Sequence, residues 1–405
     1  MAGFISARSM GMTRKILVTG ASIAGNTVAA LLGRHGADVT VVERAPSFRD
    51  GGQNVDVRGV GREVLRRLGI EQAALDCGTG EQGTVWVNED GSEAARFDAD
   101  EIDGDGPTAE MEILRGDLAR VLHDATGNEV AFRYDDHIVA IVEEEQAAAV
   151  TFASGTIARY DAVIIAEGVG STTRDIIFPD ENDPRWMDMI IAYFTIPRTA
   201  DDDQMWRWFN APGKRSVSLR PDNQGTTRAM LCLSKEPGGE QEWDSDRQKA
   251  FVRDRFSDAG WEAPRVLAAM DYTDDFYFDV LRQVRMPRWS KGRVVLTGDA
   301  AWCATPLAGV GTTLAVTGAY VLAEELARSA TVAEAFSAYE EQMRPMVEDG
   351  QGIPKIAPRL MHPKTRLGIR LLHGTLGLAS LPPARNAAVK LFGGDGVAVD
   401  LSRYD

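Results

Sequence analysis

Cysteine and histidine are scarce in this chain of 405 residues. The three cysteines, Cys77, Cys232 and Cys303, lie far apart and form no Cys-x-x-Cys pair, and none of the five histidines has HExxH spacing. Such a sparse, odd set argues against a disulfide framework and against a structural zinc site. We therefore expect no metal site, and a reducing compartment.

Long hydrophobic runs are also missing. No stretch of about 18 uncharged apolar residues occurs, and the closest one, residues 367–381, is interrupted by Arg370 and His373. The first twelve residues lack the apolar segment of a signal peptide. The sequence thus predicts a cytoplasmic protein without a transmembrane helix.

Positive charge is the third deficit. The chain has 60 acidic and 44 basic residues, a net charge of −16 and a pI of about 4.9. Such a surface repels phosphate groups, so we expect no nucleic-acid partner and no stable membrane association. Hydrophobic residues make up 44% of the chain, enough for a large core. The length predicts two to three domains.

The N-terminal part has the pattern of a βαβ unit. An apolar run at residues 15–19 is followed by a glycine-rich turn at residues 20–25 and a helical stretch at residues 27–35. A second apolar run follows at residues 39–42. Because crossovers of this kind are right-handed, the two strands are expected to be parallel neighbours.

Helix and strand patterns follow along the chain. Continuous apolar runs at residues 162–166 and 292–297 indicate further buried strands. From about residue 175, a block rich in aromatic residues indicates a separate antiparallel sheet. The expected helices are 56–68, 115–125, 243–259, 315–328 and 333–347; the other expected strands are a hairpin at 84–97, a meander at 130–160, and 186–197, 205–210, 214–220 and 226–234.

The turn Gly20-Ala21-Ser22-Ile23-Ala24-Gly25 suits a dinucleotide pyrophosphate, although Ser22 replaces the usual second glycine. By itself the motif is equally typical of a tight βα turn. Glu43 ends the second strand 23 residues after Gly20, where a carboxylate can accept hydrogen bonds from a ribose. A short-chain dehydrogenase is disfavoured because no tyrosine is followed by lysine four residues later.

Two later segments each place an acid after a buried strand. One is Asp161-Ala-Val-Ile-Ile-Ala-Glu-Gly-Val-Gly-Ser-Thr-Thr-Arg174, and the other is Gly292-Arg-Val-Val-Leu-Thr-Gly-Asp-Ala-Ala301, continued by Pro306-Leu-Ala-Gly-Val-Gly311. With the first turn, these motifs make residues 15–347 resemble the group A flavoprotein monooxygenases. This is the p-hydroxybenzoate hydroxylase-like family, which includes tetracycline-inactivating and polyketide-tailoring hydroxylases.

The resemblance implies an α/β fold. It consists of a Rossmann-like FAD-binding domain, an inserted and mainly antiparallel β-sheet substrate domain, and a C-terminal helical segment. This segment either caps the pocket or packs on the FAD-binding domain, and we expect the packing. The expected boundaries are 13–78, 108–175 and 286–348 for the FAD-binding domain, 79–107 and 176–285 for the substrate domain, and 349–405 for the C-terminal segment.

The resemblance also implies cofactor contacts at matching positions. The first turn would bind the pyrophosphate, and Glu43 would bind the ribose. Asp299 would bind the ribityl or pyrophosphate portion, and a helix that starts near Gly311 would face the flavin. The implied FAD-binding residues are Gly20, Ser22, Ala24, Gly25, Glu43, Arg44, Asp56, Arg58, Arg115, Glu167, Gly168, Gly298, Asp299, Pro306, Leu307, Ala308, Gly309, Val310, Gly311 and Thr312.

Three positions depart from the family pattern. Ser22 replaces a glycine, and Glu167 replaces the usual aspartate of the Asp-Gly motif, which serves FAD and the nicotinamide cofactor. Trp302 stands where many members have histidine, and we interpret it as a packing residue or as part of a pocket wall. The resemblance implies that NAD(P)H docks transiently without a Rossmann domain of its own, and the single dinucleotide fingerprint fits this expectation.

The implied activity is insertion of one oxygen atom into an aromatic or polyketide-like small molecule by hydroxylation, with NAD(P)H, O2 and a flavin C4a-hydroperoxide. Trp206, Trp208 and Arg220 are the candidate substrate-binding residues, and the sequence singles out no catalytic residue. A halogenase or a reductase of the same fold stays an alternative, although the Trp-x-Trp at Trp206 lacks the halogenase Ile-Pro. A non-catalytic FAD- or ligand-binding relative is the third alternative.

Overall fold

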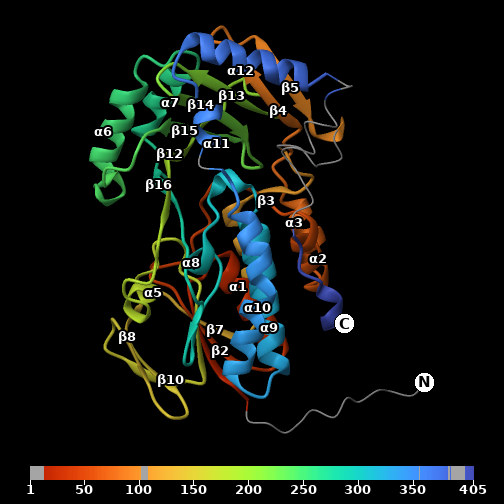
Figure 1. Cartoon of the computed structure of the whole chain (residues 1–405), viewed down its shortest axis with the longest axis vertical. Coiled ribbons are helices and arrows are strands. Elements are labelled where there is room, and N and C mark those ends of the chain that lie inside the picture. Colours follow the sequence, from red (N-terminus) through yellow and green to blue (C-terminus); the bar gives the residue numbers. More distant parts are fainter. Residues whose placement is uncertain (1–12, 102–107, 355, 382–383, 385–396) are drawn as a thin grey trace, which may run out of the picture.

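The computed structural model describes residues 13–101, 108–354, 356–381, 384 and 397–405. Residues 1–12, for which no signal peptide is expected, lie outside the described residues. Figure 1 shows an elongated molecule with one sheet in its lower half and another in its upper half. No described helix is long and apolar enough to cross a membrane.

The lower sheet has six strands in the order β17-β18-β11-β1-β2-β7. Central strand β1 is parallel to both neighbours, with Leu17 beside Val163 on one side and Thr40 on the other. Its apolar runs form strands because they are buried within the sheet, as expected. The strands are β1 (Lys15–Thr19), β2 (Asp38–Val42), β7 (Val130–Arg133), β11 (Ala162–Ile165), the antiparallel edge strand β17 (Ser290–Lys291) and β18 (Val294–Leu296).

Helices pack around this sheet. Helix α1 packs on α9, and α9 also packs on α2 and α10. Thr331 begins α10 with a capping box, in which its side chain accepts from the Glu334 N–H and the Glu334 side chain accepts in return. The helices are α1 (Ile23–Arg34), α2 (Gly59–Arg67), α3 (Glu71–Asp76), α4 (Arg115–Asp124), α5 (Thr172–Ile177), α8 (Asp299–Trp302), α9 (Gly311–Arg328) and α10 (Val332–Gly350).

The upper sheet has seven strands in the order β16-β12-β15-β14-β13-β4-β5. All neighbours are antiparallel except β13 and β4, so the mainly antiparallel sheet is confirmed. The expected hairpin and four strands are present. The strands are β4 (Gly83–Val87), β5 (Glu93–Asp98), β12 (Arg185–Pro197), β13 (Met205–Ala211), β14 (Arg215–Pro221), β15 (Thr226–Ser234) and β16 (Tyr277–Gln283).

Two expected elements differ from the structure. The helix expected from residue 56 begins at Gly59, because Asn54–Asp56 form strand β3 and pair with Glu112–Leu114, strand β6. The expected meander is confirmed for β8 (Ile138–Glu143), β9 (Ala148–Phe152) and β10 (Ile157–Tyr160), whereas its first strand, β7, joins the parallel sheet.

The upper sheet is covered on both faces. Helices α6 (Ser245–Phe256) and α7 (Ala263–Met270) pack on one face through Val252, Phe256 and Val266. The opposite face carries Trp86, Trp208 and Met230 and packs against Leu376.

The C-terminal helices do not pack where we expected. Helix α12 (Arg366–Ala379) lies on β5 and β13, and α11 (Ala357–Met361) on β12. Both helices therefore cover the upper sheet. They shield its aromatic face, which would otherwise be open. A final turn at Leu401–Tyr404 returns to the lower half, where the Tyr404 and Tyr320 rings meet at 5.6 Å.

Trp302 is a packing residue, as interpreted from the sequence. It is 1% exposed, and its ring lies 4.4 Å from that of Trp289 and 5.9 Å from that of Tyr339. Gly318 of α9 makes room for it, since a Cβ there would lie 2.7 Å from the Trp302 ring.

We expect Trp302→Ala to lower the free energy of unfolding by about 3–5 kcal/mol, because the cavity left in the core cannot close completely. Urea unfolding followed by circular dichroism measures the loss. Tyr272→Ala is the control, because Tyr272 is 89% exposed and its truncation should change little. Equal losses in the two variants would contradict the packing role of Trp302.

Candidate functional site

A cavity of about 1900 Å³ runs from the edge of the lower sheet to the upper sheet. Its wall includes the turn after β1, the loop before α9 and strands of the upper sheet. Every predicted cofactor and substrate residue lines it except Gly25 and Gly298.

The first turn forms the N-terminus of α1 at this cavity. Ser22 is the N-cap residue, its side chain makes no capping bond, and no acidic residue lies in the first turn of the helix. The Arg115 guanidinium donates to the Ser22 hydroxyl at 2.9 Å. An uncapped helix N-terminus beside an arginine attracts a phosphate group.

Two of the predicted glycines serve packing. A Cβ on Gly25 would lie 1.8 Å from the carbonyl oxygen of Gly20, so Gly25 lets α1 approach the turn. Gly298 has a φ of +60°, and a Cβ there would lie 2.9 Å from the Cβ of Ala24. Both shape the turn from outside the cavity wall.

Glu43 stands directly after β2 at the cavity. Its carboxylate accepts from the backbone N–H groups of Ala21 at 3.0 Å and Ala45 at 2.9 Å. These two bonds fix the carboxylate, and each oxygen keeps a further lone pair for a hydroxyl donor. Arg44 follows it in the cavity wall.

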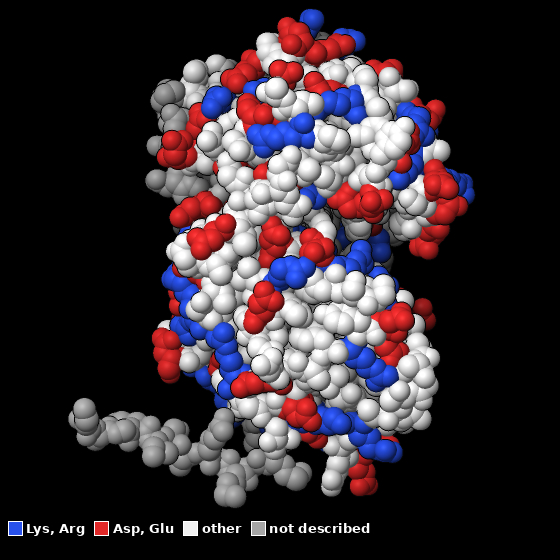
Figure 2. Space-filling model, turned by 180° about the vertical axis from the view of Figure 1, so that it is seen from behind, with Lys and Arg blue, Asp and Glu red and all other residues white. Residues whose placement is uncertain are grey.

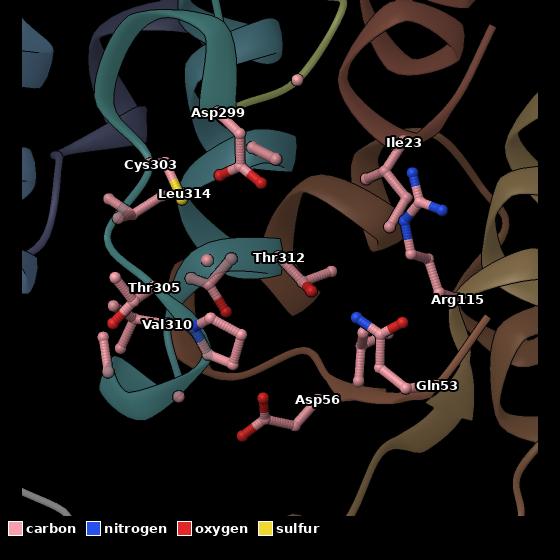
Figure 3. Close-up of a pocket in the computed structure, with 18 of the residues that line it drawn as sticks. Ile23, Gln53, Asp56, Arg115, Asp299, Cys303, Thr305, Val310, Thr312 and Leu314 are labelled. Atoms are coloured by element: carbon pink, nitrogen blue, oxygen red, sulfur yellow. The ribbon is translucent and has the colours of Figure 1, made fainter. Parts of the chain in front are cut away.

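The opposite side of the cavity is formed by α8 and α9. Figure 3 shows the Asp299 side chain pointing into the space between the loop at Thr305 and Arg115. The enclosing walls raise the pKa of Asp299, and the positive charge of Arg115 opposes this. Helix α9 begins after Val310 without a side-chain cap and without an acid in its first turn.

Thr305, in the loop between α8 and α9, has a strained backbone conformation. Its φ is +79°, which is unfavourable for a β-branched residue, and its buried hydroxyl oxygen has no hydrogen-bond partner among the described residues. Two uncapped helix N-termini, an arginine, a carboxylate at a strand end and an unpartnered hydroxyl thus face one elongated space. This set of donors and acceptors fits FAD, which carries a pyrophosphate, ribose and ribityl hydroxyls, and a ring with polar edges.

Glu167 has a local structural task. Its carboxylate accepts from the Thr19 hydroxyl at 2.7 Å, the Ser171 hydroxyl at 2.6 Å, and the backbone N–H and hydroxyl of Thr173 at 3.1 and 2.6 Å. These bonds tie the start of α5 to β1. Glu167 and Gly168 still line the cavity.

The upper half of the cavity has a tryptophan wall, formed by Trp86, Trp206 and Trp208. The rings of Trp86 and Trp208 are stacked at 6.3 Å, and those of Trp206 and Trp208 lie 5.1 Å apart. The three buried indole nitrogens have no hydrogen-bond partner among the described residues. The flat indole faces of the wall are suited to packing against a flat ring system.

Arg220 lies against this wall, and its charge is compensated. Its guanidinium stacks over Trp206 at 4.2 Å and donates to Glu81 at 2.7 and 3.0 Å and to Glu112 at 2.9 Å. The sequence analysis did not identify Glu81 and Glu112 as residues of the site. One signal was available, because Glu112 stands between the apolar residues Met111 and Ile113.

Two carboxylates share one guanidinium here, so one negative charge is left without a counterion in the cluster. Glu81 is the better stabilised, because it accepts two hydrogen bonds from Arg220 and one from the Thr108 hydroxyl at 2.8 Å, whereas Glu112 accepts one from Arg220 and one from the Ala109 N–H at 3.1 Å. Burial raises the pKa of Glu112 to about 8; Arg220 lowers it, and Glu81 and Asp56 raise it further. Burial therefore favours the protonated form of Glu112 in this cluster.

Asp56 and Arg58 meet beside this cluster. The Arg58 Nε donates to the Asp56 carboxylate at 2.5 Å, and the Arg58 backbone N–H donates to the Thr313 hydroxyl at 3.0 Å. In Figure 3, Asp56 lies across the cavity from Asp299. The pair thus stands between the two halves of the cavity.

His362 is another wall residue that the sequence did not indicate. Its Nδ1–H donates to the Pro358 carbonyl at 2.8 Å, and its Nε2 accepts from the Ser216 hydroxyl at 3.0 Å. Burial lowers its pKa to about 4, so the ring is neutral. Among the described residues, no group of three or more His, Cys, Asp or Glu side chains could hold a metal ion.

Comparisons with known proteins agree with this site. The sequence model of a family described as "FAD binding domain" matches residues 13–350. The FAD-dependent monooxygenase asL6 of Sarocladium schorii is 32% identical over 383 residues, covering 88% of this chain and 90% of the relative. A flavin-dependent monooxygenase from an unknown prokaryotic organism is 36% identical over 346 residues, covering 84% and 89%.

A solved structure supports the same assignment. The tetracycline destructase Tet(55) is 30% identical, with a TM-score of 0.81, and the match covers 97% of this chain and 100% of that structure. Klebsiella pneumoniae HpxO, solved with FAD and uric acid, shares the fold at 21% identity, with a TM-score of 0.76 and coverage of 95% and 98%. The chain therefore belongs to the FAD-binding-domain family of group A flavoprotein monooxygenases.

Proposed function

We propose that the protein uses NAD(P)H and O2 to hydroxylate an aromatic or polyketide-like small molecule, with FAD as its cofactor. The observation that carries this proposal is the single cavity, which joins the dinucleotide edge of the lower sheet to the tryptophan wall of the upper sheet. The cofactor and the substrate would meet in the middle of this cavity, between the lower and the upper sheet. We also propose the domain division given above, with 13–78, 108–175 and 286–348 as the FAD-binding part.

The chain's own groups define how FAD would be held. The N-terminus of α1 and Arg115 would bind the pyrophosphate, Glu43 the adenosine ribose, and Asp299 the ribityl chain. The backbone N–H groups at the start of α9 would lie against the flavin edge, where a helix N-terminus stabilises negative charge. The carboxyl of Asp299, whose pKa burial raises, would accept hydrogen bonds from the ribityl hydroxyls.

Bound FAD would supply the redox chemistry: the substrate RH, O2, NAD(P)H and a proton become ROH, water and NAD(P)+. The protein's part is to orient the ring and exclude water. The tryptophan wall would hold the flat substrate, and Asp56, Arg58 and Glu112 would supply polar contacts where the halves of the cavity meet.

The charges in the wall favour an uncharged substrate. Arg220 is already paired with Glu81 and Glu112, so it does not offer an unpaired cation to an anion. Protonated Glu112 can donate to a carbonyl or hydroxyl oxygen of the ring system. Relatives named for tetracycline and crystallised with uric acid support a polar, fused-ring substrate class.

The absorption spectrum tests the cofactor. We expect purified protein reconstituted with FAD to show oxidised flavin bands that disappear when NADH or NADPH is added without oxygen, faster with a ring substrate such as tetracycline. Dithionite is the control for reducibility. A protein that takes up no FAD, or whose flavin only dithionite reduces whatever ring compound is added, would contradict the proposal.

Glu43→Gln should weaken FAD binding about tenfold to a hundredfold, because a charged acceptor for the ribose hydroxyls is lost. Quenching of FAD fluorescence on titration with apoprotein measures the dissociation constant. Glu341→Gln is the matched control, since Glu341 is exposed on α10. If Glu43→Gln and wild type bind FAD with equal affinity, Glu43 does not contact the cofactor.

The proton on Glu112 predicts a pH dependence. Because the pKa of Glu112 is about 8 in the folded chain, the folded state holds a proton that the unfolded chain releases. This contribution to the free energy of unfolding is complete below the unfolded pKa of about 4.3 and is lost as the pH rises toward 8.

We therefore expect the free energy of unfolding of wild type to fall more steeply between about pH 5 and 8 than that of Glu112→Gln. Urea unfolding of the apoprotein at several pH values measures the difference, with Glu341→Gln as the control. Parallel pH profiles for wild type and Glu112→Gln would show that Glu112 is ionised in the folded protein.

A further inference from the structure

Helix α12 has two apolar faces. Its inner face buries Ile369, His373 and Leu376 against the upper sheet. Its outer face carries Leu367 and Leu371, with 67% and 64% of their surface exposed, and Leu378, with 66% exposed. These three leucines are spaced by four and seven residues, so they lie on one side of the helix. Figure 1 shows α12 at the upper end of the molecule, outside the sheet.

The segment that carries α12 differs in charge from the whole chain. Its described part, residues 350–354, 356–381 and 384, contains four arginines and lysines (Arg359, Lys364, Arg366 and Arg370) and no aspartate or glutamate, although the chain as a whole has a net charge of −16. Arg366 is paired with Glu89. Lys364 and Arg370 are exposed and make no ion pair with another described residue. Figure 2, which shows the molecule from behind, has both signs of charge intermixed on its surface.

We propose that the outer face of α12 binds reversibly to the surface of an anionic lipid bilayer. Leu367, Leu371 and Leu378 would enter the boundary between headgroups and acyl chains, and Lys364 and Arg370 would contact lipid phosphates. An exposed apolar strip flanked by basic side chains is typical of helices that lie on a membrane. This mode needs no spanning helix, and the described residues contain none.

The net negative charge of the chain does not prevent such binding. At physiological ionic strength, charges more than about 8 Å apart across water are largely screened. The membrane therefore responds mainly to the side chains nearest to it, which on this face include the three leucines, Lys364 and Arg370; Glu89, which also lies beside α12, is paired with Arg366. Acidic residues elsewhere on the surface would limit the affinity and keep the binding reversible.

A second copy of the chain fits this face less well. In a twofold dimer the same face meets itself, so the cations of both copies would gather in one interface with no acidic residue of α12 to pair with them. Three leucines of one helix also cover far less than the roughly 1,000 Å² expected of a stable interface. Anionic headgroups, in contrast, complement both cations.

Helix α12 lies between the proposed lipid-binding surface and the cavity. Leu376 on its inner face lines the cavity, as do Met361 and His362 just before the helix. The inner face of α12 thus forms part of the cavity wall at the upper sheet, and its outer face would contact the membrane. This link, which rests on the proposed function, favours substrates lipophilic enough to partition into a bilayer.

Flotation with lipid vesicles tests the proposal on the full chain loaded with FAD, or on the apoprotein. We expect binding to vesicles of phosphatidylglycerol and phosphatidylcholine at about 0.1 M salt, weaker binding at about 0.5 M salt, and little binding to pure phosphatidylcholine. Because the readout is lipid binding, a protein without monooxygenase activity would still test it.

Two variants separate the contributions of the face. The triple variant Leu367→Ser, Leu371→Ser, Leu378→Ser should lose at least tenfold in vesicle affinity. Lys364→Gln with Arg370→Gln should lose about fivefold for each charge. The matched control replaces three exposed apolar residues of β8 and β10 by serine, namely Val139, Val142 and Ile157, and should bind as wild type.

Each other outcome overturns the proposal. Wild type that floats with neither vesicle type, or equal loss in the control and the leucine triple variant, removes α12 as a lipid-binding surface. Wild type that sediments as a dimer, is converted to a monomer by the leucine triple variant and does not bind vesicles shows that a second copy covers the face. Circular dichroism of every variant verifies that the fold is intact.

Discussion

The parallel arrangement of β1, β2, β11 and β18 is the constraint on which the rest of the structure depends. Strands that run the same way end at one edge, so their following turns face one cavity. The helices α1 and α9 then start at that edge with unpaired N–H groups. Glu43 and Asp299 stand there for the same reason, at the ends of parallel strands.

The upper sheet turns this cofactor edge into a reaction site. Its aromatic face forms the tryptophan wall, and Arg220 brings Glu81 and Glu112 together within it. The desolvation of this cluster raises the pKa of Glu112. Helix α12 covers the same face, so its two sides connect the cavity with the outside of the molecule.

Much of the fold could be predicted because its signals are local. The glycine-rich turn, the apolar runs and the acids after them each lie within a few residues, and their order identifies the family. The helix boundary at Gly59 and the place of α12 were predicted wrongly. A short strand such as β3 depends on its partner β6, and an amphipathic helix does not specify which sheet it covers.

The sequence by itself determined the cofactor edge, since strand, turn and helix are consecutive there and backbone geometry aligns them. The tertiary structure decided the chemistry of the upper wall. Arg220 meets Glu81 and Glu112 across sequence separations of 139 and 108 residues. Such pairs leave no periodic pattern in the chain. Their charges and pKa values follow from burial, and burial exists only once the two sheets have packed together.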